Sequence, residues 1–187
     1  AYVFTRLEFK GRNIVFILYL STMMIPITVR LIPSYNLCRN LNMLDTYMGM
    51  ILPQVAWSIP FGTFLMRQFY MGIPKQLDEA AKIDGASHFQ IFWKILLPNT
   101  KSSMTTLGIY TFISAWNNLI WMLLSVRSES KWTVTLGISS ICGASVIKQP
   151  TWNLIMGVIV IGMIPVLILF FAFQKYFMQS VAATGIK

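Results

Sequence analysis

Charged residues are scarce in this sequence. They make up 11% of its 187 residues, and only six are acidic, whereas ordinary globular proteins are roughly 25% charged. Hydrophobic residues make up 56%. A soluble domain of this length needs more polar surface to cover its core. The shortage of charge argues against a soluble globular protein and favours one whose surface faces lipid.

The groups on which enzymes and nucleic-acid binders depend are also few. One histidine and two cysteines fit no metal-ligand spacing, and no nucleophile–base set is visible. The sequence has no G-x-x-x-x-G-K-S/T phosphate loop, so we expect no ATP site of the usual kind. Its 15 Lys and Arg residues lie singly between apolar runs, unlike the clusters of a nucleic-acid binder. We expect no enzyme activity, metal, cofactor or nucleic-acid partner, and we expect unpaired thiols at Cys38 and Cys142, with a disulfide as the alternative.

Four stretches are apolar enough and have the length of about 20 residues that a membrane helix needs. Polar or helix-breaking residues lie within all four. The first contains Pro26, the second contains Gln54 between Pro53 and Pro60, the third contains the pair Asn117 and Asn118, and the fourth, the most uniformly apolar, contains Pro165. The four predicted spans are Ile14–Ile32, Tyr47–Met66, Met104–Val126 and Leu154–Phe173. We expect the second helix to be bent, with Gln54 either lining a cavity or packing against neighbouring helices.

Basic residues are distributed unequally between the two sides that these spans define. One side carries ten of them: Arg6, Lys10, Arg12, Arg67, Lys75, Lys82, Lys94, Lys101, Lys175 and Lys187. The other side carries five: Arg30, Arg39, Arg127, Lys131 and Lys148. Cytoplasmic loops are enriched in Lys and Arg, so we expect residues 67–101 (the inner loop) and the C-terminus to be cytoplasmic. Residues 127–153 (the outer loop) are expected to form a polar loop on the other side.

The inner loop has the pattern of two helices joined by a turn. Pro74 is suited to the first turn of a helix, and Gly85 to the position just past its end. Ser87 followed by Gln90 is typical of a capping box at the start of a second helix.

The faces of these two helices differ in character. In the first, Leu77, Ala80, Ala81 and Asp84 share one side at helical spacing, beside the carboxylates of Asp78 and Glu79. Small residues allow a partner to approach closely, and carboxylates offer charge-assisted bonds to a basic rim. In the second, the aromatic and apolar residues share one face: Phe89, Phe92, Trp93 and Leu96. We expect the hairpin, with His88, to dock on a partner; the alternative is a hairpin that rests on the membrane surface.

The same residues carry a resemblance to a known family. The segments Glu79-Ala80-Ala81, Gly85 and Ile95-x-Leu97-Pro98 have the spacing of the EAA loop of binding-protein-dependent ABC permeases. Three further segments resemble the carbohydrate permeases of the maltose type: residues 1–12, residues 112–118 and the tail Gly185-Ile186-Lys187. That family usually has six spans, so the resemblance implies that the first span and most of the second are missing here. Its members often have an acidic residue at the position of Asn118.

The resemblance implies an all-α integral membrane helical bundle of the type I importer, forming one transmembrane domain over residues 1–187 with about four spans. The inner loop would be the coupling loop, and its ATPase-docking residues would be Glu79, Ala80, Ala81, Asp84, Gly85, Ile95, Leu97 and Pro98. The implied partners are ABC ATPase subunits, a second permease subunit, an extracytoplasmic solute-binding protein and membrane lipid. The implied location is the bacterial inner membrane and the implied cargo is a sugar.

The residues suggest where a sugar would pass. Trp116 offers a ring face for stacking, and the amides of Asn117, Asn118 and Gln54 offer hydrogen bonds at membrane depth. The alternative is that these amides bond between helices. Two alternative functions are a secondary transporter driven by an ion gradient and a membrane scaffold. No Asp or Glu lies inside a predicted span, which disfavours proton coupling.

Overall fold

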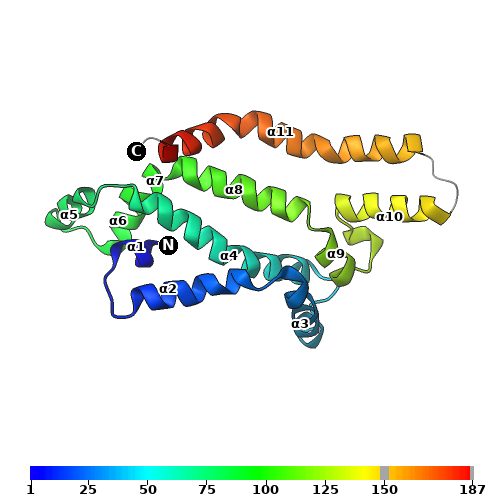
Figure 1. Ribbon diagram of the computed structural model, residues 1–187, viewed down its shortest axis with the longest axis horizontal. Helices are drawn as coiled ribbons and strands as arrows, with labels where there is room; N and C mark the ends of the chain where they lie inside the picture. The colour runs from blue at the N-terminus through cyan, green and yellow to red at the C-terminus, as the bar shows by residue number, and fades with distance from the viewer. Residues whose placement is uncertain (148–151, 186–187) are drawn as a thin grey trace. The chain divides into compact units, whose positions relative to one another are not determined.

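The computed structural model describes the backbone of residues 1–147 and 152–185, and the side chains of residues 1–143 and 152–174. Throughout this part of the chain the regular elements are helices, as expected (Figure 1). In chain order they are α1 (Tyr2–Arg6), α2 (Arg12–Ser21), η1 (Thr22–Met24), α3 (Ile27–Asn40), α4 (Tyr47–Met71), α5 (Gln76–Ile83), α6 (His88–Ile91), η2 (Phe92–Leu96), α7 (Leu97–Asn99), α8 (Lys101–Trp116), α9 (Leu119–Ser125), η3 (Glu129–Lys131), α10 (Val134–Ile147) and α11 (Trp152–Gly185).

The chain forms two compact units. The first comprises residues 1–24, 58–109 and 173–187, and the second comprises residues 25–57 and 110–172. The first unit has a core of Met66, Tyr70, Ile91 and Leu96. The core of the second unit consists of Cys38, Met50, Trp121, Met122, Val126 and Leu136.

Two helices are each long and apolar enough to cross a membrane: Tyr47–Met71 and Trp152–Gln174. They correspond to the second and fourth predicted spans. The helix α4 runs through Pro53 and Pro60 without a break, and its predicted bend stays a prediction. Counting each of two bent helix pairs as one span raises the total to four.

The first and third predicted spans are wrong as continuous helices. The first is broken between Arg12–Met24 and Ile27–Asn40, and the third divides into Lys101–Trp116 and Leu119–Ser125, bent by 54°. The first break falls at Pro26, whose backbone is extended (φ −56°, ψ 143°), because proline donates no hydrogen bond and disfavours helical geometry in the residue before it. The second break falls at Asn117 and Asn118.

The outer loop is also more ordered than predicted. Residues 134–147, within the segment expected to be a polar loop, form the apolar helix α10. Gly162 of α11 lies close to this helix, since a Cβ added there would be 2.6 Å from Ile138 Cδ1. Residues 148–151, including Lys148, lie outside the described residues, as do Ile186 and Lys187 and the side chains of residues 175–185. The predicted cytoplasmic C-terminus and the resemblance of residues 185–187 therefore remain predictions.

Candidate functional site

The first helix of the inner loop ends as its sequence predicts. Asp84 caps α5, and Gly85 follows with φ +80°, a left-handed conformation that costs glycine little. The N–H of Ala86 donates to the carbonyl of Ala81 over 2.9 Å, and the N–H of Gly85 donates to that of Lys82 over 3.0 Å. This pair of bonds is the Schellman motif. It satisfies carbonyls that the helix end would otherwise leave unpaired.

The predicted capping box starts the second helix. The Ser87 N–H donates to Gln90 Oε1 over 2.7 Å, and the Gln90 N–H donates to Ser87 Oγ over 3.3 Å. The reversal of the chain between α5 and α6 is therefore fixed at both ends by bonds among neighbouring residues.

The predicted apolar face of the second helix is confirmed in part. The rings of Phe89 and Phe92 both contact that of Trp93, with centroids 6.1 Å and 5.7 Å away. Leu96 is fully buried, whereas Phe89 is 72% exposed. Residues 92–96 form a π-helix, whose turn has more residues than an α-helical one, so Leu96 does not follow the spacing of an α-helical face.

Four of the predicted docking residues form an exposed surface at the end of α5, which we call the tip surface: Glu79, Ala80, Asp84 and Gly85. Ala81 and Ile95 are half-buried and pack against the core of the first unit. Leu97 is half-buried, and Pro98 is exposed in α7. The tip surface thus presents two carboxylates around small residues, as expected, while the other four residues divide between support and exposure.

Asp78 does not belong to the tip surface, contrary to the prediction that its carboxylate faces a partner. It is 6% exposed, and its Oδ2 lies 2.9 Å from Nε of Arg6 in an ion pair. The partner arginine lies in α1, far away in the sequence, so no pattern within the inner loop signals the pair. The only signal for the ion pair is that Asp78 is an acidic residue on the side of α5 that packs inward.

His88, predicted to contribute to docking, is exposed and bonded within the chain. Its Nδ1 lies 3.1 Å from the Tyr2 hydroxyl. His88 also lines a cavity of about 600 Å³. The other lining residues come from the segment 6–9 and from the inner loop: Arg6, Leu7, Glu8, Phe9, Lys75, Asp78, Glu79 and Lys82.

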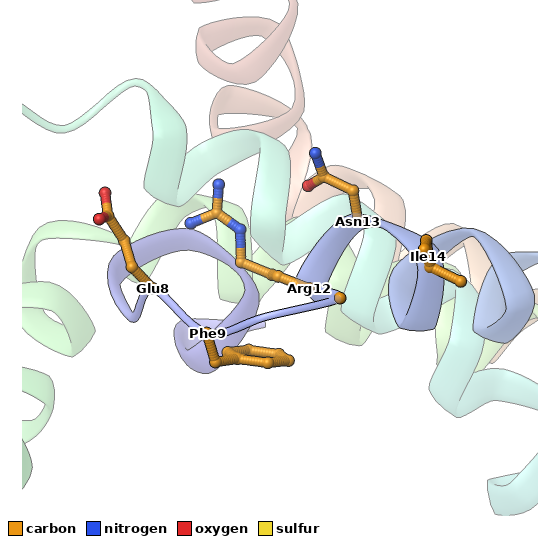
Figure 2. A pocket seen from close by; sticks show the side chains of 6 residues that line it. Glu8, Phe9, Arg12, Asn13 and Ile14 are labelled. Atoms are coloured by element: carbon orange, nitrogen blue, oxygen red, sulfur yellow. The ribbon is translucent and has the colours of Figure 1, made fainter.

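A second cavity of about 400 Å³ lies at the turn before α2. Figure 2 shows the side chains of Glu8, Arg12 and Asn13 extending to one side of this turn and Phe9 to the other. Gly11 has φ +81° at the turn, and Arg12 Nη1 donates to the Leu7 carbonyl over 3.2 Å. The mixture of one acidic, one basic, one amide and two apolar side chains favours no class of ligand.

The predicted substrate-path residues lie at the break between α8 and α9. Asn118 is half-buried and its Oδ1 accepts a hydrogen bond from the Trp121 N–H over 3.3 Å, so it caps α9. Asn117 is exposed. Trp116 is half-buried and stacks on Phe112 with ring centroids 5.6 Å apart. Gln54 is half-buried in the continuous α4. The bond made by Asn118 is local and not the interhelical bond that the alternative required.

Sequence reasoning missed two bonded arrangements in the second unit. The first joins α9 to α4: the indole N–H of the fully buried Trp121 donates to the Gly49 carbonyl over 3.0 Å. In a regular helix this carbonyl would accept from residue 53, but Pro53 has no N–H. The proline was therefore a usable signal, because it leaves a carbonyl that needs another donor.

The second arrangement joins the loop before α4 to the loop after α9. Asp45 accepts hydrogen bonds from the N–H of Arg127, the N–H of Ser128 and the Ser128 hydroxyl. Lys131 Nζ lies 3.6 Å from its carboxylate. The Ser128 hydroxyl first, then the two backbone donors, lower the pKa of Asp45 from its usual value.

The prediction for the cysteines also has an outcome. Both cysteines are free thiols, Cys38 buried and Cys142 half-buried, as expected. Arg30 lies over the ring of Trp57, 5.7 Å from its centroid. A cation in this position is attracted to the ring face.

Residues 1–183 match the family described as "Binding-protein-dependent transport system inner membrane component". The chain is similar to the arabinooligosaccharides transport system permease protein AraQ of Bacillus subtilis, with 34% identity over 96% of this chain and 62% of that protein. It is also similar to the sn-glycerol-3-phosphate transport system permease protein UgpE of Yersinia enterocolitica, with 38% identity over 96% of this chain and 63% of that protein.

A solved structure has the same fold. It is a bacterial ABC transporter involved in the import of the acidic polysaccharide alginate, with a TM-score of 0.76, 27% identity, and coverage of 94% of this chain and 65% of that chain. The chain thus spans a little over three fifths of the curated relatives named above, 62% and 63% of their lengths. On the match over residues 1–183, the chain belongs to the family of inner membrane components of binding-protein-dependent transport systems.

Proposed function

We propose that this chain is part of the permease subunit of an ATP-driven importer of carbohydrates, and that the inner loop docks on a separate ATPase subunit. The tip surface is the observation that carries the proposal. Glu79 and Asp84 are exposed around Ala80 and Gly85, so a groove with a basic rim can close on the helix and pair with its carboxylates. The partner ATPase supplies the energy and this chain supplies the path.

Carbohydrate cargo is supported by the names of two relatives. AraQ belongs to an arabinooligosaccharides transport system, and UgpE to a transport system for sn-glycerol-3-phosphate, a polyol phosphate that also carries hydroxyl groups. Within this chain, the break between α8 and α9 supports the same cargo. It exposes the Asn117 amide and leaves Trp116 half-buried, and amides and aromatic rings are groups that bind sugars through hydroxyls and ring faces. We include Trp116, Asn117, Asn118 and Gln54 in the substrate path on this basis.

The remaining partners follow from the family. A binding-protein-dependent system includes a solute-binding protein, which delivers cargo on the extracytoplasmic side, and a second permease subunit completes the path. We place the inner loop and the C-terminus in the cytoplasm, since the side of the inner loop carries ten of the 15 basic residues.

The docking proposal is tested by co-purifying the full-length subunit with its transporter partners in a mild detergent. The test variant is Gly85→Asp, which adds bulk and charge to the tip surface. Gly11→Asp is the matched control, because both glycines have almost the same backbone (φ +80° and +81°) and open space around the Cα. We expect the control to retain the ATPase subunit and the Gly85→Asp variant to lose it.

Two results would count against docking at this loop. Equal retention of the ATPase by both variants would show that the tip surface is not the contact. Absence of an ATPase from the wild-type complex would contradict ATP-driven import and direct attention to ion-driven transport.

A further inference from the structure

The short helix α1 is bonded to the inner loop at both of its ends. Near its start, the Tyr2 hydroxyl contacts His88 Nδ1 over 3.1 Å. At its end, Arg6 pairs with Asp78 of α5 over 2.9 Å and donates from Nη2 to the Ile73 carbonyl over 2.8 Å. A separate polar contact comes from α4, where Arg67 Nε donates to the Phe4 carbonyl over 3.4 Å.

The Arg6–Asp78 pair is buried more deeply than an ordinary surface salt bridge. The two side chains are 4% and 9% exposed. Neither Asp78 Oδ1 nor Arg6 Nε has a hydrogen-bond partner among the described residues, so the contact is an ion pair, and the Arg6 guanidinium is the charge that compensates this carboxylate. A buried charge that loses its partner is strongly unfavourable. Separating α1 from α5 is therefore much harder than sliding two apolar surfaces past each other.

The other side of α1 packs on α2. The ring of Phe4 lies 5.2 Å from that of Phe16 and 6.4 Å from that of Tyr19. The backbone between the two helices turns at Gly11, whose φ is +81°. Helix α1 thus lies between α5, which it meets through an ion pair, and α2, which it meets through aromatic rings.

We propose that the Arg6–Asp78 ion pair makes α1 and α5 move as one body, and that Asp78 and Arg6 are positioning residues that pass movement of the inner loop to α2. The inference rests on the proposed function, since it takes the ATPase as the source of the movement. It assigns a different role to each side of α5: the tip surface receives the force, and buried Asp78 transmits it.

The first test compares the same substitution at two arginines, in the full transporter reconstituted with its partners. Arg6→Gln removes the bond to α5. Arg39→Gln is the control, because Arg39 is an exposed residue of α3 in the second unit. The readouts are the amount of ATPase subunit retained and the stimulation of ATP hydrolysis by the loaded solute-binding protein. Asp78→Asn is measured alongside as the reciprocal change.

We expect Arg6→Gln and Asp78→Asn to retain the ATPase, because the tip surface is unchanged, and to lose stimulation by about tenfold, within the range of coupling between sites. Arg39→Gln should stay within about twofold of wild type. Wild-type stimulation in Arg6→Gln would overturn the proposal, and so would loss of the ATPase from Arg6→Gln, which would make the pair part of docking. Failure of the proposed function is recognised separately: the wild-type complex would then hold no ATPase, or the Gly85→Asp variant would retain as much ATPase as the Gly11→Asp control.

The second test needs no variant of the ion pair. Val3 of α1 and Lys82 of α5, both exposed, are replaced with cysteine to carry spin labels. Cys38 and Cys142 are replaced with alanine so that they are not labelled. The distance between the labels is measured by pulsed electron resonance with and without a non-hydrolysable nucleotide bound to the complex. One body predicts the same distance distribution in both states. A change in the mean distance between states would refute the proposal.

Discussion

The bond between Trp121 and Gly49 leads to a quantitative prediction, because the structure gives a reason for it. Trp121 is fully buried, and its N–H donates to a carbonyl that Pro53 leaves without its usual helical donor. Trp121→Phe removes the donor while keeping an aromatic ring. A buried carbonyl without a partner costs about 1–3 kcal/mol, and the smaller ring adds a packing loss.

A second substitution separates these two costs. In Pro53→Ala, residue 53 regains an N–H four residues after Gly49, in position to donate to the same carbonyl. We therefore expect Trp121→Phe to cost about 1 kcal/mol less in the Pro53→Ala background than in the wild type, whereas the packing loss is the same in both. Trp132→Phe, at a ring 37% exposed, should show no dependence on residue 53.

The measurement is equilibrium unfolding in mixed detergent micelles titrated with sodium dodecyl sulfate, followed by far-ultraviolet circular dichroism, since substitution of Trp alters fluorescence directly. Four proteins complete the cycle: wild type, each single variant and the double variant. If the cost of Trp121→Phe is the same in both backgrounds within about 0.5 kcal/mol, the carbonyl of Gly49 does not depend on the indole, and the reasoning fails.

Further predictions concern glycine and pH. Gly49→Ala should destabilise the protein by about 1–3 kcal/mol or more, because the new Cβ would lie 2.0 Å from the backbone oxygen of Met43. Gly108→Ala, where a Cβ meets nothing within 4 Å, should instead stabilise α8 by about 0.5–1 kcal/mol. Thermal unfolding in detergent compares the two variants. Equal effects would contradict the close approach of Gly49 to the Met43 backbone. The pKa of Asp45 is lowered in the folded protein, so the hydrogen bonds of its ionised carboxylate stabilise the fold. This stabilisation is fully present above about pH 4, the ordinary aspartate range, and is lost as the pH falls further through the folded-state pKa. Asp45→Asn should therefore lower the unfolding temperature at pH 7, and the gap from wild type should narrow in acid; a gap independent of pH would refute the role of the charge.

The parts of the inner loop that were predicted correctly depend on neighbours in the sequence. Gly85 ends α5 through bonds to Ala81 and Lys82, and Ser87 starts α6 through a bond to Gln90. Such signals can be recognised without knowledge of the rest of the fold. The long apolar runs were likewise sufficient to locate the helices of two spans.

The parts that were missed depend on residues far apart. Asp78 reads as one more exposed carboxylate until Arg6 is known to lie beside it, 72 positions earlier in the chain. The bond from Trp121 to the Gly49 carbonyl joins α9 to α4 and likewise depends on residues far apart. The π-helical turn at residues 92–96 has no simple sequence signature, and Leu96 at its end is buried while Phe89 before it is exposed.

The bonds of Asp45 also bear on when this part of the chain can fold during synthesis. The donor Ser128 is separated from Asp45 by 83 residues, which takes about 4 to 17 s to synthesise at roughly 5–20 residues per second. During that interval α4 has been translated, but the loop before it has none of these bonds. The loop therefore forms these hydrogen bonds late, after α9 has emerged from the ribosome. Until then the carboxylate of Asp45 is accessible to water or to the machinery that inserts the chain into the membrane.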